Sequence, residues 1–265
     1  MTDSEKNVTI TKDVFLVIEI QGWKTRMTQQ NSFGRWYQRF LGKLIPEYGA
    51  ITLAIGFMFN SFVYWGTQQL MGNQYHYDFT ASFDRKVPFV KEWIVIYIGC
   101  YLFWAVNYVL IAREGKENCY RFATADILSR IICAIFFIVL PTTNIRPEVI
   151  GTDVFSVWMR FIYQMDPATN LFPSIHCLVS WFCFIGIRKS KKVSTWYKVF
   201  SCVMALLICA STQFTKQHYM IDVVGGLVLA EVCFWIAHHS QLVIVISKLY
   251  DSIRRWIFGI TVENE

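Results

Sequence analysis

Apolar residues along this chain gather into long runs separated by short polar stretches. Four runs approach the ~20 residues that a helix needs to cross the core of a bilayer. They cover residues 49–66, 93–112, 196–214 and 219–237. Two shorter runs, 127–140 and 175–187, count as further spans if their outer ends pack against protein. The pattern therefore predicts an all-α, polytopic membrane protein with six transmembrane helices.

The segment before the first run is polar but contains one amphipathic stretch. Its apolar residues recur at helical spacing, while Arg35, Arg39 and Lys43 form a basic stripe. The apolar members are Phe33, Trp36, Tyr37, Phe40, Leu41 and Leu44. This pattern predicts an interfacial helix on the membrane surface. We therefore divide the chain into an N-terminal segment at 1–45, a six-helix domain at 46–240 and an amphipathic tail at 241–265.

Composition and charge agree with a membrane location. Hydrophobic residues make up 54% of the chain, which is too many for an ordinary soluble domain. Most lysines and arginines lie in the N-terminal segment, in the loops near 113–121 and 188–192, and in the tail. The opposite loops hold only Arg85, Lys86, Lys91, Arg146, Arg160 and Lys216. The positive-inside rule then predicts cytoplasmic termini in a multi-pass protein of the cell membrane.

The net charge of +6 is explained by this topology and by contact with anionic lipid. We expect the lipid bilayer and a membrane lipid substrate as partners, and no nucleic acid. The sequence sets no oligomeric state. The eight cysteines fall in or beside the spans without a Cys-x2-Cys spacing, so they predict apolar packing rather than a metal site.

The most informative polar pair is His218 with Asp222, four residues apart where an apolar run begins. On a helix such residues share one face, so Asp222 can orient one imidazole nitrogen and leave the other free. That arrangement suits a nucleophile or a base. The same spacing also occurs in structural contacts and in half of a metal site.

Two further polar clusters reach the same predicted outer face of the membrane. Arg146 follows the third span and offers planar donors for phosphate oxygens. Ser174, after Pro173, begins the fourth span, where free backbone N–H groups bind anions, and His176 follows. Each has a plain alternative: a helix cap for Arg146 or Ser174, and an interfacial contact for His176. Their convergence beside His218 favours a phosphate site.

At these residues the chain resembles the type-2 phosphatidic acid phosphatase superfamily of integral-membrane lipid phosphatases and phosphotransferases. That pattern has three parts: Lys-x6-Arg-Pro, Pro-Ser-Gly-His, and Ser-Arg-x5-His-x3-Asp. The matching positions are Arg146-Pro147, then Pro173, Ser174 and His176, then Ser211, His218 and Asp222. The resemblance covers about residues 46–240.

Three positions depart from the pattern. Val139 stands where the first lysine is expected, Ile175 replaces the glycine, and Thr212 replaces the arginine. Both lost cations belong to a phosphate site, so the usual phosphatidate and pyrophosphate specificity is in doubt. Lys216, one helical turn after Thr212, is the candidate replacement cation. The losses look more like the branch that contains inositol phosphorylceramide and sphingomyelin synthases.

The resemblance implies a mechanism without a metal or cofactor. His218, oriented by Asp222, would attack phosphorus and form a phosphohistidine, and His176 would protonate the leaving group. Arg146, Ser174 and Lys216 would hold the phosphate oxygens. With water as acceptor the chain would be a lipid phosphatase that acts on a lipid phosphate or pyrophosphate at the outer leaflet. With a lipid hydroxyl it would be a phosphotransferase, and a non-catalytic transporter or scaffold is the third alternative.

Overall fold

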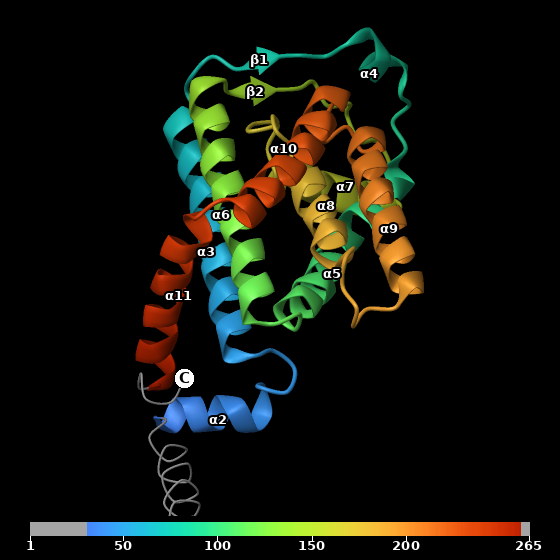
Figure 1. The fold of residues 1–265 in the computed structure, drawn as a ribbon. Coiled ribbons are helices and arrows are strands. Elements are labelled where there is room, and N and C mark those ends of the chain that lie inside the picture. The colour runs from blue at the N-terminus through green and yellow to red at the C-terminus, as the bar shows by residue number, and fades with distance from the viewer. Residues whose placement is uncertain (1–30, 261–265) are drawn as a thin grey trace, which may run out of the picture.

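The computed structural model describes residues 31–260 and is almost entirely helical (Figure 1). Within that range, five helical segments are long and apolar enough to cross a membrane: α3 (Glu47–Met71), the unit Lys91–Ala112, α6 (Lys116–Val139), α9 (Thr195–Phe214) and α10 (Met220–His239). The unit Lys91–Ala112 joins a 3-10 turn, η1 (Lys91–Trp93), to α5 (Ile94–Ala112). The prediction of a polytopic helical membrane protein is thus confirmed in its general form.

The short apolar run at 127–140 belongs to a longer helix than the sequence pattern indicated. Helix α6 begins at Lys116 and has 24 residues, so its length suffices for a span. The hydrophobic pattern did not indicate the first half of α6, because that half contains polar and charged residues. In the helix these charged side chains form ion pairs with one another. Arg121 bonds Glu117 one turn earlier (2.9 Å), and Arg130 bonds Asp126 (2.8 Å) inside the protein.

Helix α8 (Ile175–Ile187) is the remaining expected span, and it has only 13 residues. At ~1.5 Å per residue its length is about 20 Å, less than the ~30 Å of a bilayer core. It contacts α5, α9 and α10, and Figure 1 shows it between them. Most of its residues are buried against these neighbours, so α8 forms the centre of the bundle.

The chain segments outside these helices gather at the two ends of the bundle (Figure 1). One end carries α4 (Ser82–Lys86), α7 (Val154–Met165) and a two-stranded parallel sheet of β1 (Tyr77–Asp78) with β2 (Thr142–Thr143). In this sheet Tyr77 pairs with Thr142, which ties the first long connection to the segment after α6. The α5–α6 turn lies at the opposite end.

The predicted amphipathic stretch forms α2 (Ser32–Phe40), capped by the side chain of Asn31. Phe33, Trp36 and Phe40 are exposed. Tyr37 instead turns inward and packs edge-on against Phe258, with ring centroids 5.0 Å apart. The helical part of the prediction is therefore seen. The basic residues before position 31 lie outside the described residues.

The C-terminal segment forms α11 (Leu242–Phe258), which packs along α3 and α6 and reaches α2. Arg254 is buried there and bonds Glu47 at the start of α3, with Nη1 and Oε1 3.1 Å apart. The tail is thus docked on the bundle by a helix. The C-terminal end of α11 lies at the bundle end opposite to β1 and β2 (Figure 1).

Candidate active site

The end of α9 fixes the backbone of His218. After Phe214 the chain leaves the helix, and Lys216 adopts a left-handed conformation with φ of 52°. The turn brings the N–H groups of Gln217 and His218 back to the carbonyl oxygen of Thr212, at 2.9 and 3.1 Å. The side-chain amide of Gln213 donates to the carbonyl of His218 at 2.9 Å. His218 is therefore held by backbone bonds before any substrate arrives.

Asp222 lies behind His218, although the two residues do not share a helix as the sequence analysis assumed. Helix α10 begins at Met220, because Asp222 turns back to accept the N–H of Tyr219 at 2.8 Å and caps the helix. Its Oδ2 lies 3.5 Å from Nδ1 of His218, which is an ion-pair distance rather than a short hydrogen bond. The other ring nitrogen of His218 is left for a substrate.

Burial and charge act in opposite directions on His218. Burial lowers its pKa, but the nearby carboxylate of Asp222, together with Cys177 and Asp166, raises it, and the net pKa lies above the ordinary value of 6.5. Both side chains are almost inaccessible to solvent. The pair thus resembles a general base that is oriented by a carboxylate and shielded from solvent.

His176 enters the site from the first turn of α8. Ser174 caps this helix by accepting the N–H of Cys177 at 3.3 Å. Aromatic rings flank the imidazole: Tyr97 at 4.7 Å and Trp104 at 5.5 Å between centroids. The ring of His176 lies 5.8 Å from that of His218. No described protein group hydrogen-bonds its ring nitrogens, so both can serve a ligand.

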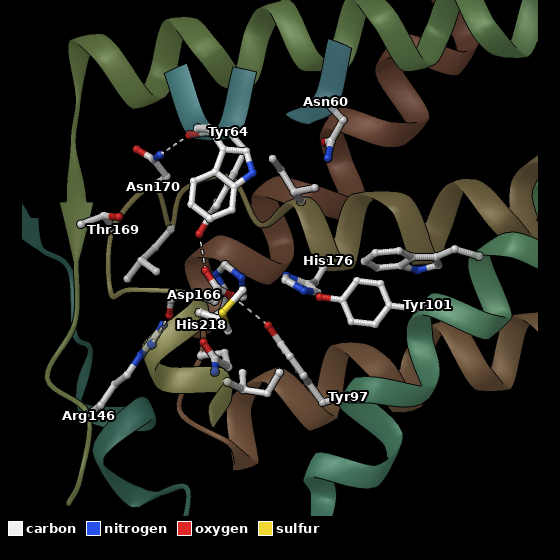
Figure 2. Close-up of a pocket in the computed structure, with 17 residues that line it drawn as sticks. Asn60, Tyr64, Tyr97, Tyr101, Arg146, Asp166, Thr169, Asn170, His176 and His218 are labelled. Atoms are coloured by element: carbon white, nitrogen blue, oxygen red, sulfur yellow. Dashed lines mark hydrogen bonds between the residues drawn. The ribbon is translucent and has the colours of Figure 1, made fainter. Parts of the chain in front are cut away.

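The two imidazoles line one cavity of about 240 Å³ (Figure 2). Arg146 lines it as well. One of its terminal nitrogens donates to the backbone carbonyl of Asp166, and its guanidinium lies 4.8 Å from the centre of the Tyr163 ring. Its Nε is buried without a protein partner. The structure therefore brings Arg146, His176 and His218 together, with Asp222 immediately behind.

The other two predicted phosphate ligands lie elsewhere. The Ser174 side chain is fully buried as a helix cap and does not line the cavity. The ammonium of Lys216 donates to the carbonyl oxygens of Asp84 (2.9 Å) and Val87 (2.5 Å). Burial lowers its pKa, and the charge of Asp84 opposes this shift. Lys216 faces a separate cavity of about 510 Å³, which Arg146 also lines.

The sequence analysis missed a half-buried carboxylate in the histidine cavity. Asp166 follows α7, and its two oxygens accept the phenol groups of Tyr64 and Tyr97 (Figure 2). The Tyr97 bond measures 3.0 Å. Tyr64 belongs to α3 and Tyr97 to α5, so three distant segments meet here. The polar stretch that contains Asp166 was the only sequence signal, and it matches no motif.

Gln217 is the second missed residue. It precedes His218, is 1% exposed and lines the same cavity. Neither its Oε1 nor its Nε2 has a protein partner. Such a buried amide calls for a ligand or ordered water. As for metals, no group of three or more His, Cys, Asp or Glu side chains is arranged to hold an ion within residues 31–260.

Comparisons with known proteins place this arrangement in a family. No curated protein and no solved structure matches the chain significantly. A family model described as the PAP2 superfamily matches residues 73–236, which is more than half of the chain. That range contains both histidines, Arg146 and Asp222, while α3 with Tyr64 lies before it. The protein therefore belongs to the PAP2 superfamily, whose members are generally phosphatases or related phosphotransferases.

Proposed function

We propose that this protein cleaves the phosphate ester of a membrane lipid through a phosphohistidine on His218. The proposal rests on the arrangement of the two imidazoles, whose ring centroids are 5.8 Å apart. Both line one cavity with Arg146, and Asp222 lies behind His218. Among residues 31–260, Asp222 is an orienting carboxylate for His218, and His176 has no such partner. That asymmetry suits a nucleophile and a separate proton donor.

In the first step, the free ring nitrogen of His218 forms a bond to phosphorus. The bond from phosphorus to the lipid oxygen breaks, and His176 gives its proton to that oxygen. Arg146 and the amide of Gln217 supply hydrogen bonds to the phosphate oxygens. Asp222 stabilises the positive charge that develops on His218, as an orienting carboxylate does in a catalytic triad.

In the second step, an acceptor oxygen attacks the phosphohistidine. His176, now neutral, takes the proton of the acceptor, and the bond between nitrogen and phosphorus breaks. With water as acceptor the product is a phosphate, and the protein is a hydrolase. The enzyme returns to its starting protonation state in either case.

A lipid hydroxyl is the second candidate acceptor, and a neighbouring cavity favours it. This mainly apolar cavity of about 500 Å³ lies among α3, α5, α6 and α8, and its wall also holds the paired Asp126 and Arg130. It shares Asn60, Tyr101, Trp104 and Ile175 with the histidine cavity. Phe57 on its wall is 74% exposed on the outer surface of the bundle. A lipid chain from the bilayer can be accommodated there while its polar end reaches His176.

We further propose that α8 is the sixth span and that the cavity faces the outer leaflet. The partners α5, α9 and α10 that surround α8 support the first point, because they shield its short ends from lipid. The distribution of basic residues supports the second.

The test is an assay of the purified protein in lipid nanodiscs against a panel of lipid phosphates, with products separated by thin-layer chromatography. Each lipid is tested alone and with diacylglycerol or ceramide as acceptor. Free phosphate or phospho-headgroup indicates hydrolysis, and a new lipid spot indicates transfer. We expect activity to survive EDTA, because the proposed donors are histidine, arginine and amide groups. No product with any lipid, or loss in EDTA that Mg²⁺ restores, would contradict the proposal.

A further inference from the structure

Helix α7 has an apolar face that no described part of the chain covers. Its five members are each between 46% and 57% exposed. They are Val154, Val157, Trp158, Phe161 and Met165. At 3.6 residues per turn, these positions fall within an arc of about 100° around the helix. A surface helix normally buries an apolar face of this width, so the face on α7 calls for an apolar partner.

The rest of the circumference of α7 is divided between a buried sector and a polar edge. Met159 and Ile162 are buried in an apolar cluster with the start of α5. Arg160 and the exposed Gln164 lie along one edge of the apolar face. The guanidinium of Arg160 donates to the carbonyl oxygen of Gly151 at 2.7 Å. A helix with an apolar face and a polar edge suits the boundary between a bilayer and water.

The neighbouring helix α5 indicates the level of α7 in the membrane. The unit Lys91–Ala112 is long and apolar enough to span a bilayer, so Lys91 marks one membrane surface. Asp153, the N-cap of α7, lies 2.5 Å from Nζ of Lys91. One turn later on α5, Ile94 and Tyr97 pack in the same cluster as Met159. The first turn of α7 is therefore level with the end of a spanning helix, where acyl chains meet headgroups.

The far side of α7 and its C-terminal end form a wall of the histidine cavity. The guanidinium of Arg146 lies against the ring of Tyr163 and donates to the carbonyl oxygen of Asp166 (Figure 2). The hydroxyl of Tyr163 donates to the carbonyl oxygen of Thr215 at 2.8 Å, in the turn that leads to His218. A shift of α7 would therefore move both Arg146 and the turn before His218. The residues of this segment that line the cavity are Ile162, Met165 and Asp166.

We propose that α7 is an interfacial helix whose apolar face binds acyl chains of the adjacent leaflet, and that this contact holds the wall of the histidine cavity in place. The second part rests on the proposed function, because turnover reports it. Trp158 and Phe161 are then positioning residues, which act on the cavity through Tyr163 and Asp166. A second copy of this chain is the alternative occupant. The bilayer is favoured by the level of Lys91 and by the polar edge beside the face.

The first measurement tests what covers the face. In a Cys202→Ser background, Phe161→Cys and the control Gln164→Cys are each labelled with a nitroxide and placed in phosphatidylcholine nanodiscs. Electron paramagnetic resonance then compares collisions with oxygen, which concentrates among acyl chains, and with a water-soluble nickel chelate. We expect a several-fold higher oxygen-to-nickel ratio at position 161 than at 164. Equal ratios would overturn the proposal. So would a label at 161 that is shielded from both reagents and broadened by a label on a second copy.

The second measurement tests the link to the cavity. Phe161→Lys places a charge among the acyl chains, so kcat/KM for a lipid phosphate in nanodiscs should fall about tenfold or more. Hydrogen exchange across residues 154–166 should become faster. Phe161→Leu, which stays apolar, should retain both properties. The matched control is Trp196→Lys, since Trp196 is an exposed aromatic residue at the start of α9 that does not line the cavity.

Equal kcat/KM values for Phe161→Lys and Trp196→Lys would overturn the link between lipid contact and the cavity. If Phe161→Lys does not fold, a loss of activity in Phe161→Leu as large as that in Phe161→Ala would overturn it as well, because an apolar side chain should suffice. A wild-type protein that turns over no lipid would contradict the proposed function. The collision ratios and the hydrogen exchange would still decide whether α7 lies in the leaflet.

Discussion

The backbone N–H of Ser174 donates a hydrogen bond to the carbonyl oxygen of Asp222 at 3.1 Å. This bond joins the start of α8 to the first turn of α10, and so places His176 opposite His218. The close approach depends on Gly226, one turn further along α10. A Cβ atom at Gly226 would lie 2.6 Å from the carbonyl oxygen of Ser174, which is backbone and cannot rotate away.

Gly226→Ala should therefore separate the two helix starts. We expect a loss of about 1–3 kcal/mol in stability, typical of overpacking, together with a fall in kcat of tenfold or more. Thermal unfolding in detergent and steady-state kinetics measure the two effects. The control is Gly66→Ala in α3, where no heavy atom lies within 4 Å of the added methyl. If both variants behave alike, the contact with Ser174 does not position the site.

The pH dependence of the reaction reports on Asp222. His218 must be neutral to attack phosphorus, and its pKa is raised above 6.5. The acid limb of kcat/KM should therefore lie above that value, with activity increasing as the pH rises through it. Asp222→Asn removes the main group that raises the pKa of His218, so the effect of burial gains weight and the limb should move to lower pH. We also expect kcat to fall on the order of 10³- to 10⁴-fold. An acid limb at the same pH in the variant would argue against this pairing.

Leaving-group dependence should identify His176 as the acid. With a lipid alkoxide as leaving group, His176→Ala should lower kcat about 10²- to 10⁴-fold. With the p-nitrophenyl ester of the same phosphate, the loss should stay below about tenfold, since p-nitrophenol departs without full protonation. Equal losses on both substrates would mean that His176 binds phosphate and does not transfer the proton.

Much of this arrangement was readable from the sequence because it depends on the ends of apolar runs. Arg146, His176 and His218 each stand at such an end, and the structure brings them to one cavity. Asp166 and Tyr64 were not predictable in this way. In the sequence, Tyr64 is one of many aromatic residues in an apolar run. Asp166 lies in a connection that contains no repeat or motif. Their contact joins residues 102 positions apart.

Lys216 shows where local reasoning failed to place a side chain. The sequence analysis placed it one helical turn after Thr212 as a phosphate ligand, which requires the helix to continue through Lys216. Helix α9 ends at Phe214, and the left-handed turn at Lys216 directs the ammonium to the carbonyl oxygens of Asp84 and Val87. Those acceptors belong to a connection 129 residues away or more, so no local pattern could reveal them.

The orientation of the bundle in the membrane can be tested directly by chemical labelling. We predict that Ile150→Cys reacts with an impermeant thiol reagent in intact cells, whereas Lys191→Cys reacts only after the membrane is permeabilised. Both positions are exposed in the structure. Seven native cysteines are buried and Cys202 is half-buried, so a Cys202→Ser background removes the main competing thiol. The reverse labelling pattern would put the cavity on the cytoplasmic side.

The central claim is a covalent bond between phosphorus and His218. The most direct measurement is rapid acid-free quenching of the enzyme during turnover of a labelled lipid, followed by peptide mass spectrometry. The account predicts an acid-labile, alkali-stable phosphoramidate on the peptide that contains residue 218, present in His176→Ala and absent in His218→Ala. A label on His176 or on a hydroxyl residue, or steady turnover by His218→Ala, would contradict it.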